Sequence, residues 1–117
     1  MLNAGVDLTF PPDCANIAGN FVPMAKAKIS VLNWGLLRSD AVYDVAHVWR
    51  GRFFRLDTHI ARFQAGINKL SLALPFDHGQ LRTILAECGR WANLDTAHVE
   101  MILTRGVSPT FSRDHRD

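Results

Sequence analysis

The most regular pattern along the chain is an alternation of side-chain types over residues 43–49. Successive side chains of a β-strand point to opposite faces of its sheet. One face of this segment would therefore carry Tyr43, Val45, His47 and Trp49, and the other would carry Asp44, Ala46 and Val48. Arg50 and Gly51 suit a tight turn, and residues 52–56 suit a returning strand. The pattern predicts a β-hairpin.

A helical pattern follows the hairpin. Apolar residues recur at the spacing of one helix face, at Ile60, Phe63, Ile67 and Leu70. Asp57 precedes them and is a favourable N-cap, so we expect a helix from Thr58 to about Leu72. Pro75 then prevents the helix from continuing, and Gly66 weakens it slightly because glycine has a low helix propensity.

A second helix and a last strand are predicted next. Asp77 and Gln80 have the spacing of a capping box, in which each side chain bonds the other residue's amide. The apolar stripe that follows consists of Leu81, Ile84, Leu85 and Cys88. We expect this helix to end near residues 92–93, and the alternation from Ala97 to Thr104 to form a strand.

The remaining segments complete the predicted fold. Residues 1–19 are rich in turn signals and are predicted to be a loop, and residues 21–30 suit short extended pieces. The order is then strands, helix, helix, strand. This order predicts an α+β domain with two helices packed on one face of an antiparallel-rich sheet.

Composition and charge narrow the class of protein. The 117 residues are 48% hydrophobic, which suits one globular domain. No apolar run approaches the roughly 20 residues of a spanning helix, and the first ten residues lack the basic cluster of a signal peptide. Cys14 and Cys88 lack the spacing of a zinc knuckle or a disulfide framework, which favours a reducing compartment. We therefore expect a cytoplasmic protein with no membrane partner.

Nucleic-acid binding is a weaker alternative. Arg50, Arg52 and Arg55 gather around the predicted hairpin, close to several aromatic residues. The net charge is only +2, however, and no basic stripe accompanies these arginines. We favour a solvated hairpin edge, where charges discourage pairing with another chain, and we expect no nucleic-acid partner.

Five stretches together resemble a known family. Residues 53–63 read FFRLDTHIARF and resemble the F-R-L-D-x-H-I-x-R-L signature of class IV aminotransferases, the fold-type IV enzymes that use pyridoxal 5′-phosphate. The four supporting stretches are Val22 to Ser30, Gly35 before Ser39-Asp40, Tyr43-Asp44-Val45 and Thr104-Arg105-Gly106. The similarity runs from about Phe21 to Ser108.

The resemblance implies a fold, boundaries and a reaction. It covers the family's smaller N-terminal domain, so we expect an arm over residues 1–20, that domain over 21–106 and a truncated interdomain or active-site loop over 107–117. The implied function is transamination between an amino acid or amine and a 2-oxo acid, in a homodimer, as in branched-chain or D-amino acid aminotransferases. The family's aminodeoxychorismate-lyase branch stays open.

The family's catalytic lysine, which forms a Schiff base with the cofactor, lies in its larger second domain. Lys26, Lys28 and Lys69 are the three lysines of this chain, and none of them matches it. We assign all three to the solvated surface and predict no catalytic residue here. We therefore expect no transamination by these residues alone. The alternative function is an inactive domain that acts as a dimerisation or interaction module.

Arg62 is the predicted cofactor-binding residue. Spacing alone favours a solvated helix arginine. The matching residue of the family contacts the cofactor phosphate, an anion that suits a guanidinium fork. Tyr43 and Val45 match residues that line the substrate pocket, and an ordinary core position is the alternative for Tyr43. Arg38 suits either recognition of a substrate carboxylate or a plain surface position.

His98 is the last predicted substrate-binding residue. It would face the pocket together with His47 if their strands pair. A two-histidine metal site lacks a third ligand with suitable spacing, so we predict no metal. His59 resembles a structural residue of the signature and is assigned to packing and hydrogen bonding beside the Asp57 cap.

Two departures from the family pattern bear on the substrate. Asp44 stands where many relatives have glutamate, and the Y-D-V form is more similar to the (R)-amine and D-amino acid branches. D-amino acid enzymes offer an arginine and a histidine after the T-R-G motif. Those positions are Thr110 and Ser112 here, while Arg113 and His115 are displaced. The substrate is therefore left open.

Overall fold

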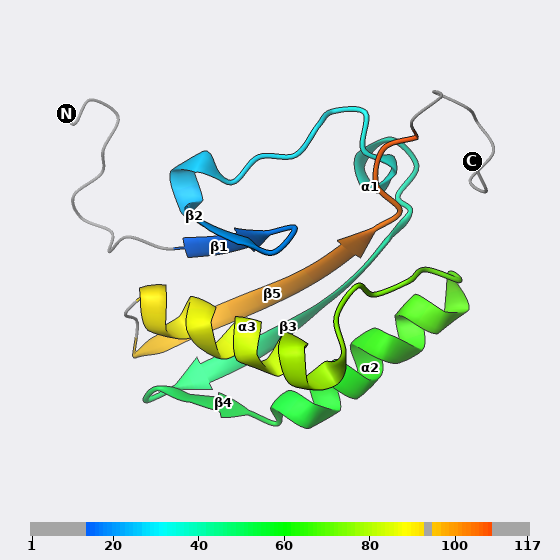
Figure 1. Ribbon diagram of the computed structural model, residues 1–117. Helices are drawn as coiled ribbons and strands as arrows, with labels where there is room; N and C mark the ends of the chain where they lie inside the picture. Colours follow the sequence, from blue (N-terminus) through cyan, green and yellow to red (C-terminus); the bar gives the residue numbers. More distant parts are fainter. Residues whose placement is uncertain (1–13, 93–94, 109–117) are drawn as a thin grey trace.

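The structure is a computed structural model that describes residues 14–92 and 95–108. Its elements in chain order are β1 (Cys14–Ile17), β2 (Asn20–Pro23), η1 (Met24–Lys26), α1 (Trp34–Leu37), β3 (Ala41–Trp49), β4 (Arg52–Phe54), α2 (Leu56–Lys69), α3 (His78–Ala92) and β5 (Thr96–Thr104). In chain order the two long helices come between β4 and β5, and Figure 1 shows both of them beside the β3–β5 pair. The predicted α+β class is confirmed.

The main sheet has three antiparallel strands in the order β4-β3-β5. β3 pairs with β5 along its whole length, from Ala41 opposite Thr104 to Trp49 opposite Thr96. β4 pairs only with residues 47–49 of β3. Over residues 41–46, therefore, no described strand pairs with the other edge of β3. The β1–β2 hairpin forms a separate two-stranded sheet.

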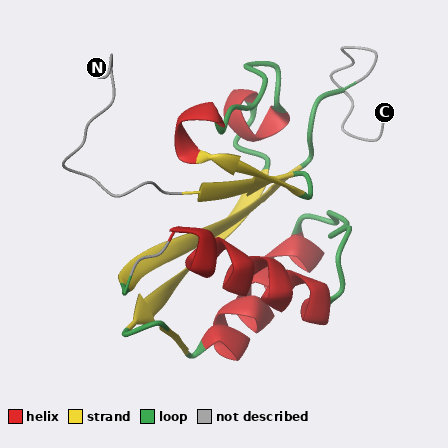
Figure 2. Ribbon diagram, turned by 60° about the vertical axis from the view of Figure 1, so that its left-hand side comes forward, coloured by secondary structure: helices red, strands yellow, loops and turns green. Residues whose placement is uncertain are grey.

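Both long helices cover one face of the main sheet (Figures 1 and 2). α2 packs against β3, and α3 packs against β5 and β1. The buried core between sheet and helices consists of Ala46, Ile60, Phe63, Ile67, Leu81, Leu85 and Met101. No described helix covers the opposite face, which we call the open face. Tyr43, Val45 and Ile102 are exposed there.

The predicted hairpin is confirmed in its alternation and its turn, but its returning strand ends at Phe54 rather than at residue 56. Asp44, Ala46 and Val48 are buried beneath the helices, whereas the alternate residues of β3 are exposed. Arg50 and Gly51 connect β3 to β4 with φ angles of 50° and 75°. Two-residue turns with positive φ match the twist of the strands that they join.

α2 begins earlier than predicted and has a different cap. The helix starts at Leu56 and follows Arg55, whose φ of 54° is left-handed. Asp57 is not the N-cap but lies in the first turn, because the chain turns sharply out of β4 and packs Leu56 against the core. Its carboxylate still suits the helix dipole and pairs with Arg82 of α3. The helix also ends earlier than expected, at Lys69.

The start of α3 is the predicted capping box. The amide of Gln80 donates to Oδ1 of Asp77 over 2.7 Å, and the amide of Asp77 donates to Oε1 of Gln80 over 2.9 Å.

The strand β1 lies in the stretch that was predicted to be a loop. It was not predicted, because four residues are too few for a periodic pattern. None of the described helices has the length and apolar character that crossing a membrane requires.

Candidate cofactor-binding site

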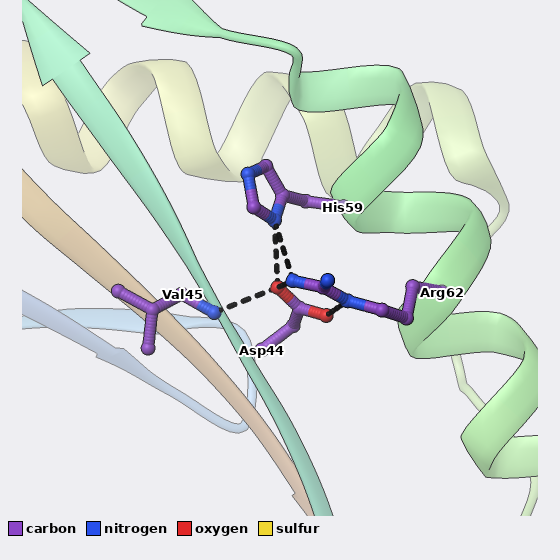
Figure 3. A network of polar contacts seen from close by, with 4 residues as sticks. All are labelled: Asp44, Val45, His59 and Arg62. Carbon is purple, nitrogen blue, oxygen red and sulfur yellow. Dashed lines mark hydrogen bonds and ion pairs between the residues drawn. The ribbon is translucent and has the colours of Figure 1, made fainter.

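Asp44 is a buried carboxylate on the helix-covered face of β3, with only 5% of the residue exposed. Burial of a charge is unfavourable unless the charge is paired and hydrogen-bonded. Its Oδ2 accepts from Nε of Arg62 over 2.6 Å, and its Oδ1 accepts from Nη2 of Arg62 over 2.9 Å. Oδ1 also contacts Nδ1 of His59 at 2.7 Å and accepts from the Val45 amide over 2.9 Å. Figure 3 shows this network.

α2 supplies both side-chain partners of Asp44. His59 and Arg62 are three residues apart, so they lie on the same helix face. The ionised carboxylate can only accept, which assigns a proton to Nδ1 of His59. Nη2 of Arg62 lies 3.2 Å from that same Nδ1. The three side chains therefore form one compact cluster between β3 and α2.

The cluster is electrostatically stable in its charged form. Hydrogen bonding from Arg62 lowers the pKa of Asp44 from 3.8 to about 2. Burial opposes this change, and the contacts with His59 and the Val45 amide support it. The same hydrogen bond to Asp44 raises the pKa of Arg62. Asp44 and Arg62 are thus an ion pair throughout the neutral range.

Arg62 is fixed on one side and open on the other. Asp44 engages its Nε and Nη2, and Nη1 has no hydrogen-bond partner among the described residues. The Arg62 side chain is 66% exposed. The cluster also lies beside residues 41–46 of β3, where β4 does not cover the strand edge. A preorganised guanidinium in this position can bind an anion from solvent.

The predicted pocket residues lie on the open face. Tyr43 is 66% exposed, so it is not a core residue of this chain. Val45 shares that face, opposite Glu100 of β5. His47 and His98 are cross-strand partners, as expected, and their rings meet edge to face with centroids 4.5 Å apart. Arg62 is on α2, on the opposite side of the sheet from these residues.

The other predicted residues occupy separate places. Arg38 follows α1, a short helix that sequence patterns did not predict, and its guanidinium lies 5.7 Å from the centre of the Trp34 ring. Lys26, Lys28 and Lys69 are exposed. Thr110, Ser112, Arg113 and His115 lie outside the described residues, so the structure does not place them.

Arg105 has a structural position. Its Nε donates to Oδ2 of Asp40 over 2.5 Å, and its Nη2 donates to the Leu70 carbonyl over 2.8 Å. Both members of the ion pair are largely buried. Arg105 thereby connects the end of β5 to the loop before β3 and to the end of α2.

A cavity of about 550 Å³ lies elsewhere, between the β3–β4 hairpin and α3. Val48 and Phe53 line it from the hairpin, and Ala86 and Gly89 line it from α3. None of the predicted site residues contributes to it. The described residues contain no group of three or more His, Cys, Asp or Glu side chains suited to a metal.

Two members of the cluster, Asp44 and His59, were not predicted from the sequence to belong to it. Asp44 was predicted only to shape the pocket, and His59 was predicted to lie beside Asp57 rather than Asp44. One signal points to them: Asp44 shares its strand face with the apolar Ala46 and Val48. A charge on a buried face requires partners from another element. Which element supplies them depends on how the helix packs.

Comparison with known proteins identifies the family. The model of the family described as amino-transferase class IV matches residues 41–115. A D-alanine aminotransferase of Listeria monocytogenes is 30% identical over 91 residues, which are 78% of this chain and 32% of that protein. A putative branched-chain-amino-acid aminotransferase of Methanocaldococcus jannaschii is 33% identical over 89 residues, 76% of this chain and 31% of that protein.

Solved structures support the same fold. The T.th. branched-chain amino acid aminotransferase, complexed with N-(5′-phosphopyridoxyl)-L-glutamate, superposes with a TM-score of 0.77 at 24% identity. The match covers 84% of this chain and 34% of that one. A fold IV transaminase from Curtobacterium pusillum has a TM-score of 0.67 at 23% identity, over 86% and 36% of the two chains.

The two kinds of comparison agree on one part of one family. The chain spans about a third of the length of the curated relatives that it matches. The family match covers well over half of the chain and includes β3, the Asp44–His59–Arg62 cluster and β5. The chain belongs to the class IV aminotransferase family.

Proposed function

We propose that this chain supplies the phosphate-holding arginine and one wall of the substrate pocket in a pyridoxal 5′-phosphate-dependent aminotransferase. The reaction would transfer an amino group between an amino acid or amine and a 2-oxo acid. The observation that carries the proposal is the Asp44–Arg62 pair, which presents a fixed guanidinium to solvent beside the free edge of β3.

The residues fit the phosphate end of that cofactor. Asp44 holds two nitrogens of Arg62, so the guanidinium plane is set before a ligand arrives and little ordering remains to be done on binding. A phosphate oxygen can accept from the remaining Nη1 in a charge-assisted hydrogen bond. Because Asp44 offsets the charge of Arg62, directed hydrogen bonding rather than net positive charge would select the ligand.

The remaining residues of the site would position the substrate. When bound, pyridoxal 5′-phosphate supplies an electron sink for the bonding electrons of the substrate carbon. Tyr43 and Val45, with His98 across the β3–β5 ladder, would line the pocket on the open face. We assign recognition of a substrate carboxylate to Arg38. The lysine that moves the proton is assigned, by family resemblance, to the second domain.

The phosphate assignment is tested by titrating the isotope-labelled chain with pyridoxamine 5′-phosphate and, separately, with pyridoxamine. Neither probe has an aldehyde, so neither labels surface lysines. We expect saturable NMR shifts at the Arg62 side chain and the Val45 amide with the phosphorylated probe alone. Arg62→Lys keeps the charge but removes the fork, and should weaken binding by about tenfold or more.

Arg82 provides the matched control. It is also a helix arginine paired with a carboxylate, but its partner Asp57 is exposed on the surface. Arg82→Lys should therefore leave the titration unchanged. Equal shifts with both probes, or no weakening in Arg62→Lys, would contradict the assignment of Arg62 to phosphate binding.

The open face favours a second role in assembly. Trp49, Phe54 and Ile102 are each more than half exposed on the open face of the sheet, together with Tyr43. Exposed apolar side chains that gather on one face mark protein-interaction surfaces, and Tyr43 and Ile102 are cross-strand neighbours here. We propose a cytoplasmic homodimer for the full enzyme, and the alternative function remains a non-catalytic dimerisation module. Sedimentation of the wild-type chain and of the Ile102→Glu variant tests whether the chain self-associates through the open face.

A further inference from the structure

The two cysteines of the chain meet in the fold, although 74 positions separate them in sequence. Cys14 is the first residue of β1, and Cys88 lies in the second half of α3. The Cys14 thiol donates to the Cys88 carbonyl oxygen with an Sγ–O distance of 3.3 Å. Both residues are half-buried. Figure 1 shows the start of β1 beside the C-terminal end of α3.

The Cys14 thiol also acts on the Cys88 thiol electrostatically. The pKa of Cys88 is raised to about 12, first by burial and then by the neighbouring Cys14, whose thiol shares a hydrogen bond with it. The contact lies where the β1–β2 hairpin packs on α3, and the β1–β2 sheet has no strand ladder to the main sheet. The hydrogen bond and the packing of α3 on β1 bring the two cysteines together, which is the first condition for a disulfide.

We propose that Cys14 and Cys88 form a reversible disulfide that attaches the β1–β2 hairpin to α3. The oxidant is a low-molecular-weight disulfide. The sulfur of Cys14, as thiolate, attacks one sulfur of that disulfide and releases the first thiolate. The sulfur of Cys88 then gives its proton to water and attacks Cys14, and the second thiolate leaves.

The exchange is balanced and has a defined order. The two cysteines lose two protons and two electrons, and one small disulfide becomes two small thiols. Attack begins at Cys14 because a thiol whose pKa is about 12 has almost no thiolate near neutral pH. Closure by Cys88 is then the slow step. Its rate should rise with pH, because closure requires the thiolate of Cys88, and burial still opposes its ionisation in the mixed disulfide.

The test follows closure in the folded chain exposed to oxidised glutathione. Samples are quenched in acid and analysed by intact mass and thiol alkylation. We expect a monomeric product that has lost two hydrogen atoms and both alkylatable thiols, and that dithiothreitol restores. Cys14→Ser and Cys88→Ser should each stop at a persistent glutathione adduct or a free thiol.

A matched variant separates this geometry from chance encounter. Cys14→Ser combined with Ala15→Cys keeps two cysteines at nearly the same spacing, but the new thiol points from the other face of β1. In urea both chains should close at similar rates. Without urea, wild type should close at least about tenfold faster than the variant. Equal native rates, only intermolecular disulfides, or two persistent adducts on wild type would each overturn the proposal.

Discussion

At the scale of single residues, Asp44 determines how the site holds together. Its carboxylate is buried, whereas its main partner Arg62 is largely exposed. The two ends of the pair therefore differ in what their loss would do. Removing the buried anion frees a cation that water can solvate. Removing the exposed cation leaves a buried anion with only His59 and a backbone amide, which is the costlier change.

Asp44→Asn should lower the free energy of unfolding by about 1–3 kcal/mol, because the amide cannot replace a carboxylate that accepts from Arg62, His59 and the Val45 amide. Urea unfolding followed by circular dichroism measures the change. The control is Asp57→Asn, because Asp57 is 82% exposed in its pair with Arg82. That variant should lose less than about 0.5 kcal/mol. Equal losses in the two variants would show that burial of Asp44 contributes nothing.

The decrease of the free energy of unfolding at acidic pH should depend on the same carboxylate, that of Asp44. Asp44 has its pKa lowered from 3.8 to about 2 in the folded chain. A lowered folded pKa gives stability that is present above the unfolded value and is lost as pH falls through the folded value. Wild type should therefore lose this contribution between about pH 4 and pH 2. Asp44→Asn should show a shallower slope over that interval, measured by urea unfolding at each pH.

At the scale of elements, the approach of α2 to β3 depends on Gly66. A Cβ built on this residue would lie 2.7 Å from Cγ1 of Val42, which is closer than such atoms approach in folded proteins. The sequence pattern indicated only that glycine weakens the helix. The structure shows what it permits, namely the close packing that places His59 and Arg62 over Asp44.

Gly66→Ala should therefore destabilise the chain by about 1–3 kcal/mol through overpacking, although the same change usually stabilises a helix interior by about 1 kcal/mol. Gly89→Ala in α3 is the matched control, because its added Cβ meets nothing within 4 Å, and it should stabilise. Val42→Ala should recover part of the loss in the double variant. Thermal unfolding compares all four chains, and a stabilised Gly66→Ala would refute the packing assignment.

The same scale shows what the sequence could and could not predict. The hairpin, α2, α3 and β5 follow periodic patterns, and the Asp77–Gln80 capping box is a local signature, so all were predicted. β1 and α1 are too short for periodicity. The left-handed Arg55 results from a tertiary turn. The partners of Asp44 also required the packing of α2, whereas alternation predicted only that Asp44 shares a strand face with Ala46 and Val48.

At the scale of the whole molecule, the described residues form one layer of helices on a sheet whose other face is open. The predicted pocket residues lie on that face, and Arg62, the proposed phosphate-binding residue, is exposed on α2 on the other side of the sheet. Both regions are accessible from outside the described chain. An active site built here would be closed by protein that these residues do not include.

The 117-residue chain alone should therefore give no transamination. Its three lysines are exposed, and none of them is a hydrogen-bond or ion-pair partner of the Asp44 cluster among the described residues, so we expect none to move a proton at the substrate carbon. The assay mixes the chain with pyridoxal 5′-phosphate, D-alanine or L-leucine and 2-oxoglutarate, and quantifies the product amino acid against a protein-free blank. Turnover abolished by Lys26→Arg, Lys28→Arg or Lys69→Arg would reverse this expectation.

The exposed and buried ends of the Asp44–Arg62 pair have a consequence for how such a sequence changes over generations. Arg62 neutralises a buried carboxylate whether or not a ligand ever reaches it. A copy of this domain that lost its enzymatic role would still be selected to keep Arg62, since replacing it alone destabilises the fold. The informative event is the joint replacement of both residues by an apolar pair, because that change removes the buried charge and the proposed anion site together.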